Sequence, residues 1–165
     1  MQKILISSCL LGFPVRYNGK GFLPESEIIQ TWLKEGRLIG YCPEVEGGLG
    51  VPRAAAEIFG GHGRDVIGQK AKVLTQPGED LTEAYMNGAE KALRTVQENS
   101  IQMAVLKSNS PACGIGAIYN GTFSGVLRSG DGVAAAALKS KGIKIFDENH
   151  LLEANHYLNQ IESIQ

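Results

Sequence analysis

The strongest constraint on the fold is an alternation, repeated along the chain, between short apolar runs and longer amphipathic segments. The apolar runs that have the length of buried strands lie at 3–7, 38–41, 103–107 and 144–146. The segments whose apolar side chains recur at helical spacing lie at 25–35, 79–99, 133–141 and 148–163. Strands that alternate with helices are typical of an α/β domain, because each crossover helix returns the chain to begin another parallel strand. We therefore predict an α/β domain with a mainly parallel sheet of about four to five strands.

Two glycine-rich segments, 42–72 and 108–132, lie between these elements and are far longer than the usual connection of about 4–6 residues. They contain too many apolar residues and too few charges to be disordered linkers. We predict that both are ordered, functional loops at the carboxyl ends of strands. Within or beside them we expect a short edge strand at 73–74 and a hairpin that turns on Asn120-Gly121.

Length and charge exclude several classes of protein. At 165 residues the chain is expected to form one domain, 1–165. Its 16 Lys and Arg nearly balance 17 Asp and Glu, so it lacks the basic field that follows a phosphate backbone, and we expect no duplex nucleic acid as a partner. No run of 18 apolar residues is present and the first residues lack a signal-peptide pattern, so we expect no membrane association. Nothing in the sequence indicates an oligomeric state.

The three cysteines form an odd number that cannot be a closed disulfide framework, which favours a reducing, cytoplasmic setting. Cys9 follows the first predicted strand, Cys42 follows the second, and Cys113 lies six residues beyond the third. The carboxyl ends of parallel strands share one edge of a sheet, where α/β folds bind their ligands. We therefore predict that the three thiols converge there.

Converging thiols have more than one interpretation. Three thiolates can hold zinc with a fourth ligand, in a metal-binding module without catalysis, or an iron-sulfur cluster in which one iron has no protein ligand. His62 is the only histidine in a glycine-rich segment, and the spacing leaves zinc and iron both open. Buried structural cysteines are the plainest alternative. A hydrolase that uses Cys9 or Cys113 as nucleophile is the weakest, because no histidine lies in a matching motif.

Four motifs in order resemble the TudS-type thiouracil desulfidase family: SSCLLGFPVRYNGKG, CPEVEGGLGVPRAAAEI, LKSNSPACGIGAIYNGTFSG and the GDGVAAA that follows. The resemblance runs from residue 3 to about residue 147 and leaves only the terminal helix, 147–165, outside it. Asn109 and Ala112 depart from the family pattern, in which Arg and Ser are usual. Because the three cysteines are intact, these departures affect the prediction of the substrate and not the prediction of cluster binding.

The resemblance implies a Rossmann-like, three-layer domain in which Cys9, Cys42 and Cys113 hold a 4Fe-4S cluster. It further implies that the iron without a protein ligand abstracts sulfur from a thiolated pyrimidine, a thiouracil or a related base or nucleoside. Water then replaces the sulfur, so that the oxo form and sulfide are released without redox change. Such an enzyme needs only a small-molecule partner.

The same motifs suggest roles for three other residues. Glu44, in Cys-Pro-Glu, is the predicted general base toward water, with the capping of a turn as its alternative. Ser110 is predicted to orient substrate or relay a proton, or else only to fix the turn that presents Cys113. Ser108 is a weaker candidate for substrate binding. The sequence assigns no role to three further loop residues, Arg53, Arg64 and His62.

Overall fold

The structure is a computed structural model that describes residues 1–164. Its strands are β1 Ile4–Ser7, β2 Leu38–Tyr41, β3 Ala56–Phe59, β4 Lys72–Thr75, β5 Met103–Leu106, β6 Ala117–Tyr119, β7 Leu127–Ser129 and β8 Lys144–Asp147. Its helices are the short 3-10 helix η1 Ser8–Leu11, then α1 Glu27–Lys34, α2 Pro43–Glu46, α3 Gly63–Ile67, α4 Thr82–Glu98, α5 Val133–Ser140 and α6 Leu151–Ser163. Among the described residues, no helix is long and apolar enough to cross a membrane.

The central sheet has four strands in the order β2-β1-β5-β8, and every pair is parallel. These strands coincide with the four apolar runs of the sequence. The sheet therefore confirms the predicted α/β class and the mainly parallel arrangement. Because β1 lies between β2 and β5, the segments that follow these three strands begin side by side at one edge.

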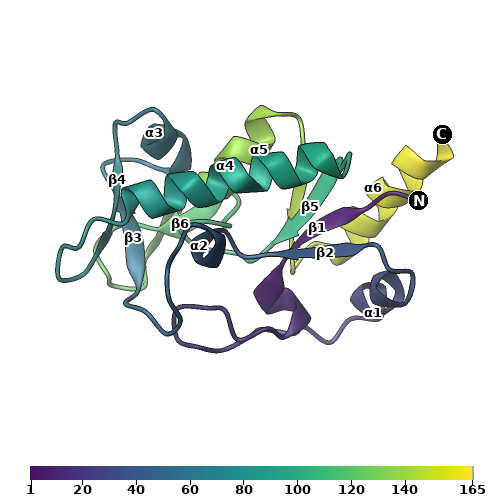
Figure 1. Cartoon of the computed structure of the whole chain (residues 1–165), viewed down its shortest axis with the longest axis horizontal. Coiled ribbons are helices and arrows are strands. Elements are labelled where there is room, and N and C mark those ends of the chain that lie inside the picture. The colour runs from purple at the N-terminus through teal and green to yellow at the C-terminus, as the bar shows by residue number, and fades with distance from the viewer. Residues whose placement is uncertain (165) are drawn as a thin grey trace.

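Alternate side chains of the strands fill two hydrophobic layers. Leu5, Ala104 and Leu106 pack on one face, in a cluster with residues of α4 and α5. Ile4, Met103 and Val105, on the opposite face, pack with residues of α1 and α6. The strands are thus buried on both sides, as is usual for a parallel sheet. Figure 1 shows the resulting three layers, with α4 and α5 across one face and α1 and α6 across the other.

The prediction of one long loop over 42–72 is wrong in its local structure. This segment contains α2, β3 and α3, and β3 pairs with β4 in antiparallel fashion, outside the central sheet. Each element spans only four or five residues, which is too short for a periodic pattern to be recognised. In Figure 1, α3, β3 and β4 form the end of the molecule opposite the two termini.

The predicted hairpin in the second glycine-rich segment is confirmed by the antiparallel pairing of β6 with β7. Its turn is wider than a two-residue turn at Asn120-Gly121, because the Asn120 amide donates to the Val126 carbonyl across the loop. The extra residues, 121–125, reach back toward β3 and contribute to the cavity described below.

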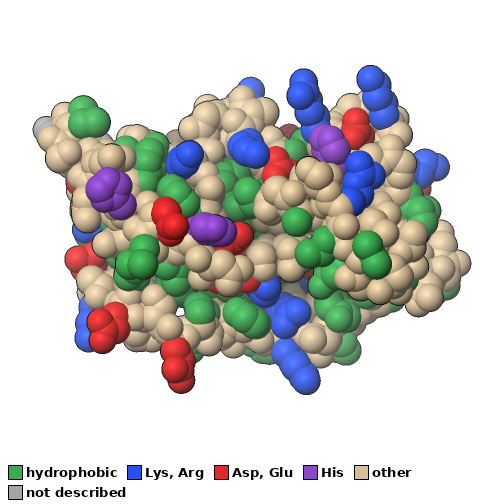
Figure 2. Space-filling view, turned by 180° about the vertical axis from the view of Figure 1, so that it is seen from behind, with side chains coloured by type: hydrophobic (Ala, Val, Ile, Leu, Met, Phe, Trp, Pro, Cys, Tyr) green, Lys and Arg blue, Asp and Glu red, His purple; other side chains and the backbone are tan. Residues whose placement is uncertain are grey.

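Charged side chains are dispersed over the face of the molecule that Figure 2 shows. Figure 2 shows Lys and Arg scattered over one face of the molecule between acidic, hydrophobic and other polar side chains. This agrees with the near balance of charge in the sequence.

Candidate functional site

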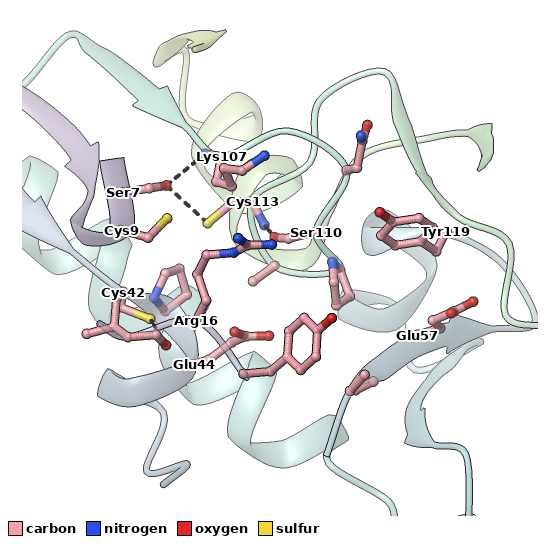
Figure 3. A pocket seen from close by; sticks show the side chains of 18 of the residues that line it. Ser7, Cys9, Arg16, Cys42, Glu44, Glu57, Lys107, Ser110, Cys113 and Tyr119 are labelled. Atoms are coloured by element: carbon pink, nitrogen blue, oxygen red, sulfur yellow. Dashed lines mark hydrogen bonds between the residues drawn. The ribbon is translucent and has the colours of Figure 1, made fainter. Parts of the chain in front are cut away.

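A cavity of about 390 Å³ lies at the carboxyl edge of the sheet and is lined by all three cysteines. Cys9 comes from η1, directly after β1, Cys42 directly follows β2, and Cys113 follows β5. The predicted convergence is therefore confirmed. Figure 3 shows the three thiols near one end of this cavity, which we call the cysteine end, and Glu57 and Tyr119 toward the other, which we call the Glu57 end.

Hydrogen bonds hold Cys113 in position from two sides. The Ser7 hydroxyl, at the end of β1, donates to the Cys113 sulfur at 3.4 Å and accepts from the Lys107 amide at 2.9 Å. The Cys113 amide donates to Ser110 Oγ at 2.7 Å. The Gly132 backbone packs so closely on this turn that a Cβ there would lie 2.8 Å from the Cys113 nitrogen. The position of Cys113 is thus fixed by β1, by its own turn and by the start of α5.

The thiols influence one another electrostatically. Burial, together with the nearby Cys42, raises the pKa of Cys9 to about 11, although Lys107 and Arg16 act in the opposite direction. Burial raises the pKa of Cys113 further, and Cys42 and Cys9 add to that rise. The pKa of Cys42 is also raised by burial. Thiols with raised pKa values are poor nucleophiles near neutral pH, so these observations argue against the cysteine-hydrolase interpretation.

Glu44 projects from the short helix α2 into the same cavity. One of its carboxylate oxygens pairs with Arg53, and the other accepts from the hydroxyl of Tyr85. The Arg53 side chain is largely buried, and it also donates to the carbonyls of Gly50 and Val15. The carboxylate is therefore held in one orientation at the cavity wall, and Arg53 has the carboxylate partner that is usual for a loop arginine.

The two candidate serines differ in how their hydroxyls are used. Ser110 Oγ accepts from the Cys113 amide, which confirms its place in the turn and leaves its own proton free to donate. Ser108 Oγ instead donates to Glu148 at 2.5 Å and accepts from Lys107 Nζ at 3.1 Å. Both serines line the cavity, but only Ser110 retains a hydroxyl proton without a protein acceptor among the described residues.

His62 and Arg64 lie away from the cavity wall. His62 is the N-cap residue of α3, and its Nε2 lies 3.5 Å from the Asp65 carboxylate. Arg64 is exposed on the same helix. Among residues 1–164, no three His, Cys, Asp or Glu side chains are grouped as a site for a single metal ion.

Comparison with known proteins now adds to this geometry. Residues 4–150 match the 2-thiouracil desulfurase family. The chain belongs to this family. It is 49% identical, over 148 residues, to the uncharacterized protein YbbK of Bacillus subtilis (strain 168), a match that covers 90% of this chain and 97% of YbbK. It also resembles the solved structure of the [4Fe-4S]-dependent thiouracil desulfidase TudS, with a TM-score of 0.89, 41% identity and coverage of 97% of this chain and 99% of the other.

The donor set of this desulfurase family member fits an iron-sulfur cluster. Such clusters take cysteine thiolates as ligands. Here three thiols face one cavity, and Cys42 lies near enough to the other two to raise the pKa of both Cys9 and Cys113, so a positively charged metal group between them would favour their thiolate forms. The fit rests on these three thiols.

Several residues of the site were missed by the sequence analysis. Lys107 and Ser7 lie at strand ends, so the rule that located the cysteines could also have located them. Arg16, whose guanidinium points into the cavity in Figure 3, lies in a segment without regular structure that offers no such signal. Glu148 and Glu57 reach the site only through tertiary packing, which the sequence pattern does not reveal.

Proposed function

We propose that this protein removes the sulfur of a thiolated pyrimidine, thiouracil or a related base or nucleoside, and releases the oxo form and sulfide. The observation that carries this proposal is the convergence of three thiols, from the ends of three neighbouring parallel strands, on one cavity. Family membership and the likeness to a [4Fe-4S]-dependent thiouracil desulfidase supply the chemistry. The overall change is thiouracil plus water to uracil plus hydrogen sulfide, so no electron donor is needed.

Cys9, Cys42 and Cys113 would hold a 4Fe-4S cluster at the cysteine end. When bound, this group supplies an iron without a protein ligand, a Lewis acid with affinity for sulfur. Around it, the chain supplies positive charge from Lys107 and Arg16, both of which favour the thiolate form of Cys9. The hydroxyl of Ser7 donates to the sulfur of Cys113, which favours its thiolate in the same way.

Glu44 is the residue that we assign to the water molecule. Its carboxylate lines the cavity and is fixed by Arg53 and Tyr85, so an acceptor oxygen is held at the cavity wall without reorganisation. Acceptance of a proton by this carboxylate as water attacks is general base catalysis. Ser110 can donate its hydroxyl proton to the substrate, because the Cys113 amide occupies only its oxygen. Ser108 remains the weaker candidate, since its proton is used by Glu148.

The same proposal treats the chain as one desulfidase-like domain that works in a reducing cytoplasm. Helix α6 lies wholly beyond the family match, yet its Ala154 and Leu158 pack in the same cluster as Trp32. Cys9, Cys42 and Cys113 are all free thiols in the structure, as expected of a protein kept in reducing conditions.

The decisive experiment is anaerobic reconstitution with iron and sulfide, followed by assay of sulfide release from thiolated bases and nucleosides. We expect about four irons per chain, absorbance near 400 nm, and conversion of at least one thiouracil to uracil with one sulfide per turnover. Protein with a full iron content that releases no sulfide from any member of the panel would contradict the proposed reaction. Protein that binds one zinc and no iron would favour the non-catalytic metal module.

A further inference from the structure

The Glu57 end of the cavity carries a buried carboxylate that the proposed reaction does not use. Glu57 lies on β3 and is only 7% exposed. Its Oε1 accepts hydrogen bonds from the amides of Gly121 at 2.9 Å and Phe123 at 3.2 Å. Its Oε2 has no hydrogen-bond partner among the described residues. Every polar side-chain atom that is fully enclosed within these residues does have a partner, so Glu57 Oε2 is not fully enclosed. Because Glu57 lines the cavity, we take this oxygen to be open to it.

The loop between β6 and β7 is shaped to hold this carboxylate. Gly121 has a φ of +89°, and a Cβ at this position would lie 2.8 Å from the Ile58 carbonyl oxygen. Phe123 has a φ of 54°, which is unfavourable for a residue with a side chain, and its ring packs on Phe59 with centroids 6.0 Å apart. Two amides in unusual backbone conformations thus converge on one oxygen, and the other oxygen is left for a ligand.

We propose that Glu57 Oε2 accepts a hydrogen bond from the substrate, at a donor on the side of the pyrimidine remote from its sulfur. This inference rests on the proposed function, because the sulfur has to face the cysteine end, and Figure 3 shows Glu57 across the cavity from Cys9 and Cys42. A carboxylate only accepts hydrogen bonds, so it selects a donor. The donor is a ring N–H or the hydroxyl of an attached sugar.

Two thiouracil isomers form a matched pair for a test. In 4-thiouracil the atom across the ring from the sulfur-bearing carbon is N1, which carries a hydrogen, whereas in 2-thiouracil that atom is C5, whose hydrogen is no useful donor. In 1-methyl-4-thiouracil the N1 donor is lost, and in 4-thiouridine a sugar with hydroxyls replaces it. These four probes distinguish the ring N–H from the sugar hydroxyl.

Glu57→Gln is the informative variant. Its amide oxygen can still accept from Gly121 and Phe123, but the cavity-facing oxygen becomes an NH₂ donor. We expect kcat/KM for 4-thiouracil to fall by about 10- to 100-fold, the worth of a hydrogen bond to a charged acceptor, mainly through KM. Turnover of 2-thiouracil and 1-methyl-4-thiouracil should change little. Glu79→Gln, an exposed carboxylate outside the cavity, is the matched control and should change none of these values.

The outcomes separate clearly. A selective loss for 4-thiouracil supports a ring N–H donor, and a selective loss for 4-thiouridine supports a sugar hydroxyl. Equal losses for all four probes, or no loss for any, would overturn the proposal and leave Glu57 as a support for the loop alone.

A binding measurement keeps this test independent of the variant's folding and of turnover. We expect wild-type, cluster-loaded protein to bind uracil about tenfold more tightly than 1-methyluracil by calorimetry, unless sugar hydroxyls are the donors, in which case uridine binds more tightly than both. Equal affinity for all three ligands would contradict the role of Glu57. Because these ligands contain no sulfur, the result stands even if no thiouracil is turned over, which would count against the proposed function instead.

Discussion

At the cysteine end of the cavity, the three thiols come from segments that follow β1, β2 and β5, whereas at the Glu57 end the groups come from β3 and from the β6–β7 hairpin. The first set is fixed by neighbouring strands of the central sheet, which is buried on both faces. The second set depends on two small antiparallel pairs outside that sheet. We infer from this difference that the central sheet positions the proposed reacting groups, and that the antiparallel pairs β3–β4 and β6–β7 position the groups that recognise the substrate.

The largest expected effect follows from replacing any one of the three proposed cysteine ligands. Cys9→Ser, Cys42→Ser and Cys113→Ser should each abolish stable iron binding, because a serine hydroxyl does not replace a thiolate toward iron. Iron content and absorbance after anaerobic reconstitution measure this. Glu57→Gln, at the other end, should keep the full iron content. A full cluster in any one cysteine variant would remove that residue from the ligand set.

Glu44→Gln should separate chemistry from cofactor binding. The amide keeps the shape of the side chain and an oxygen for Arg53, so iron content should not change, but it cannot accept the proton of water. We expect kcat to fall by about 10²- to 10⁴-fold. Glu46→Gln, an exposed residue of the same helix α2, is the control. Undiminished sulfide release by Glu44→Gln would refute its role as base.

Gly132→Ala should damage the cysteine end through its backbone. The new Cβ would lie 2.5 Å from the carbonyl carbon of Ala112, so the turn that carries Cys113 has to shift. We expect the free energy of unfolding to fall by about 3 kcal/mol, together with partial loss of iron. Gly50→Ala, where nothing lies within 4 Å of the added Cβ, should leave both values unchanged. Denaturant unfolding and iron analysis compare the two variants, and equal behaviour would show that this turn is adaptable.

Glu148→Gln tests the charge that supports the segment after β5. Burial opposes ionisation of this carboxylate, but hydrogen bonds from Lys107 and Ser108 prevail and hold its pKa below the ordinary value of 4.5. A carboxylate with a lowered folded-state pKa stabilises the protein above pH 4.5, and this contribution is lost as the pH falls through the folded-state pKa.

We therefore expect the free energy of unfolding of the wild type to exceed that of Glu148→Gln by about 2 kcal/mol at pH 7. This difference should become smaller below pH 4.5. Unfolding titrations of the metal-free protein over a pH series measure it. The exposed Glu153→Gln is the control. A difference that stays constant down to pH 3 would show that Glu148 contributes by shape instead of charge.

Gly121→Ala should give the smallest effect on activity, and this effect should be confined to the Glu57 end. A side chain at a φ of +89° costs about 1–2 kcal/mol of unfolding free energy, and the contact of the added Cβ with the Ile58 carbonyl oxygen, 2.8 Å away, adds to this cost. It should also move the loop amides away from Glu57 and raise KM, while iron content stays complete. Gly78→Ala, with a φ of +100° but nothing within 4 Å of the added Cβ, should show only the smaller stability cost of the φ and an unchanged KM. Loss of iron in Gly121→Ala would break the distinction between the two ends.

The sequence predicts the cysteine end well because the rule involved is topological. Cys9, Cys42 and Cys113 come together once the order and direction of the strands are known, whatever the detailed packing. Glu44 and Ser110, which the family resemblance singled out, line the same cavity as the three cysteines. Their partners were beyond reach, since Tyr85 lies 41 residues from Glu44 and meets it only through the packing of α4 on α2.

The Glu57 end could not be predicted for a physical reason. Strand β3 has four residues and no detectable period, so Glu57 reads as an ordinary polar residue in a loop. It becomes buried only because a loop more than 60 residues later folds over it. Burial of this kind depends on tertiary contacts between irregular segments, and no local pattern encodes them.

The strand order has a consequence for when this protein can acquire its cofactor during synthesis. β1 is bordered by β2 on one side and β5 on the other, so a growing chain that has reached only β2 presents Cys9 and Cys42 without the third thiol. Cys113 reaches them only after two-thirds of the chain has been made and β5 has inserted beside β1. The proposed set of three cysteine ligands is therefore complete only once β5 lies beside β1.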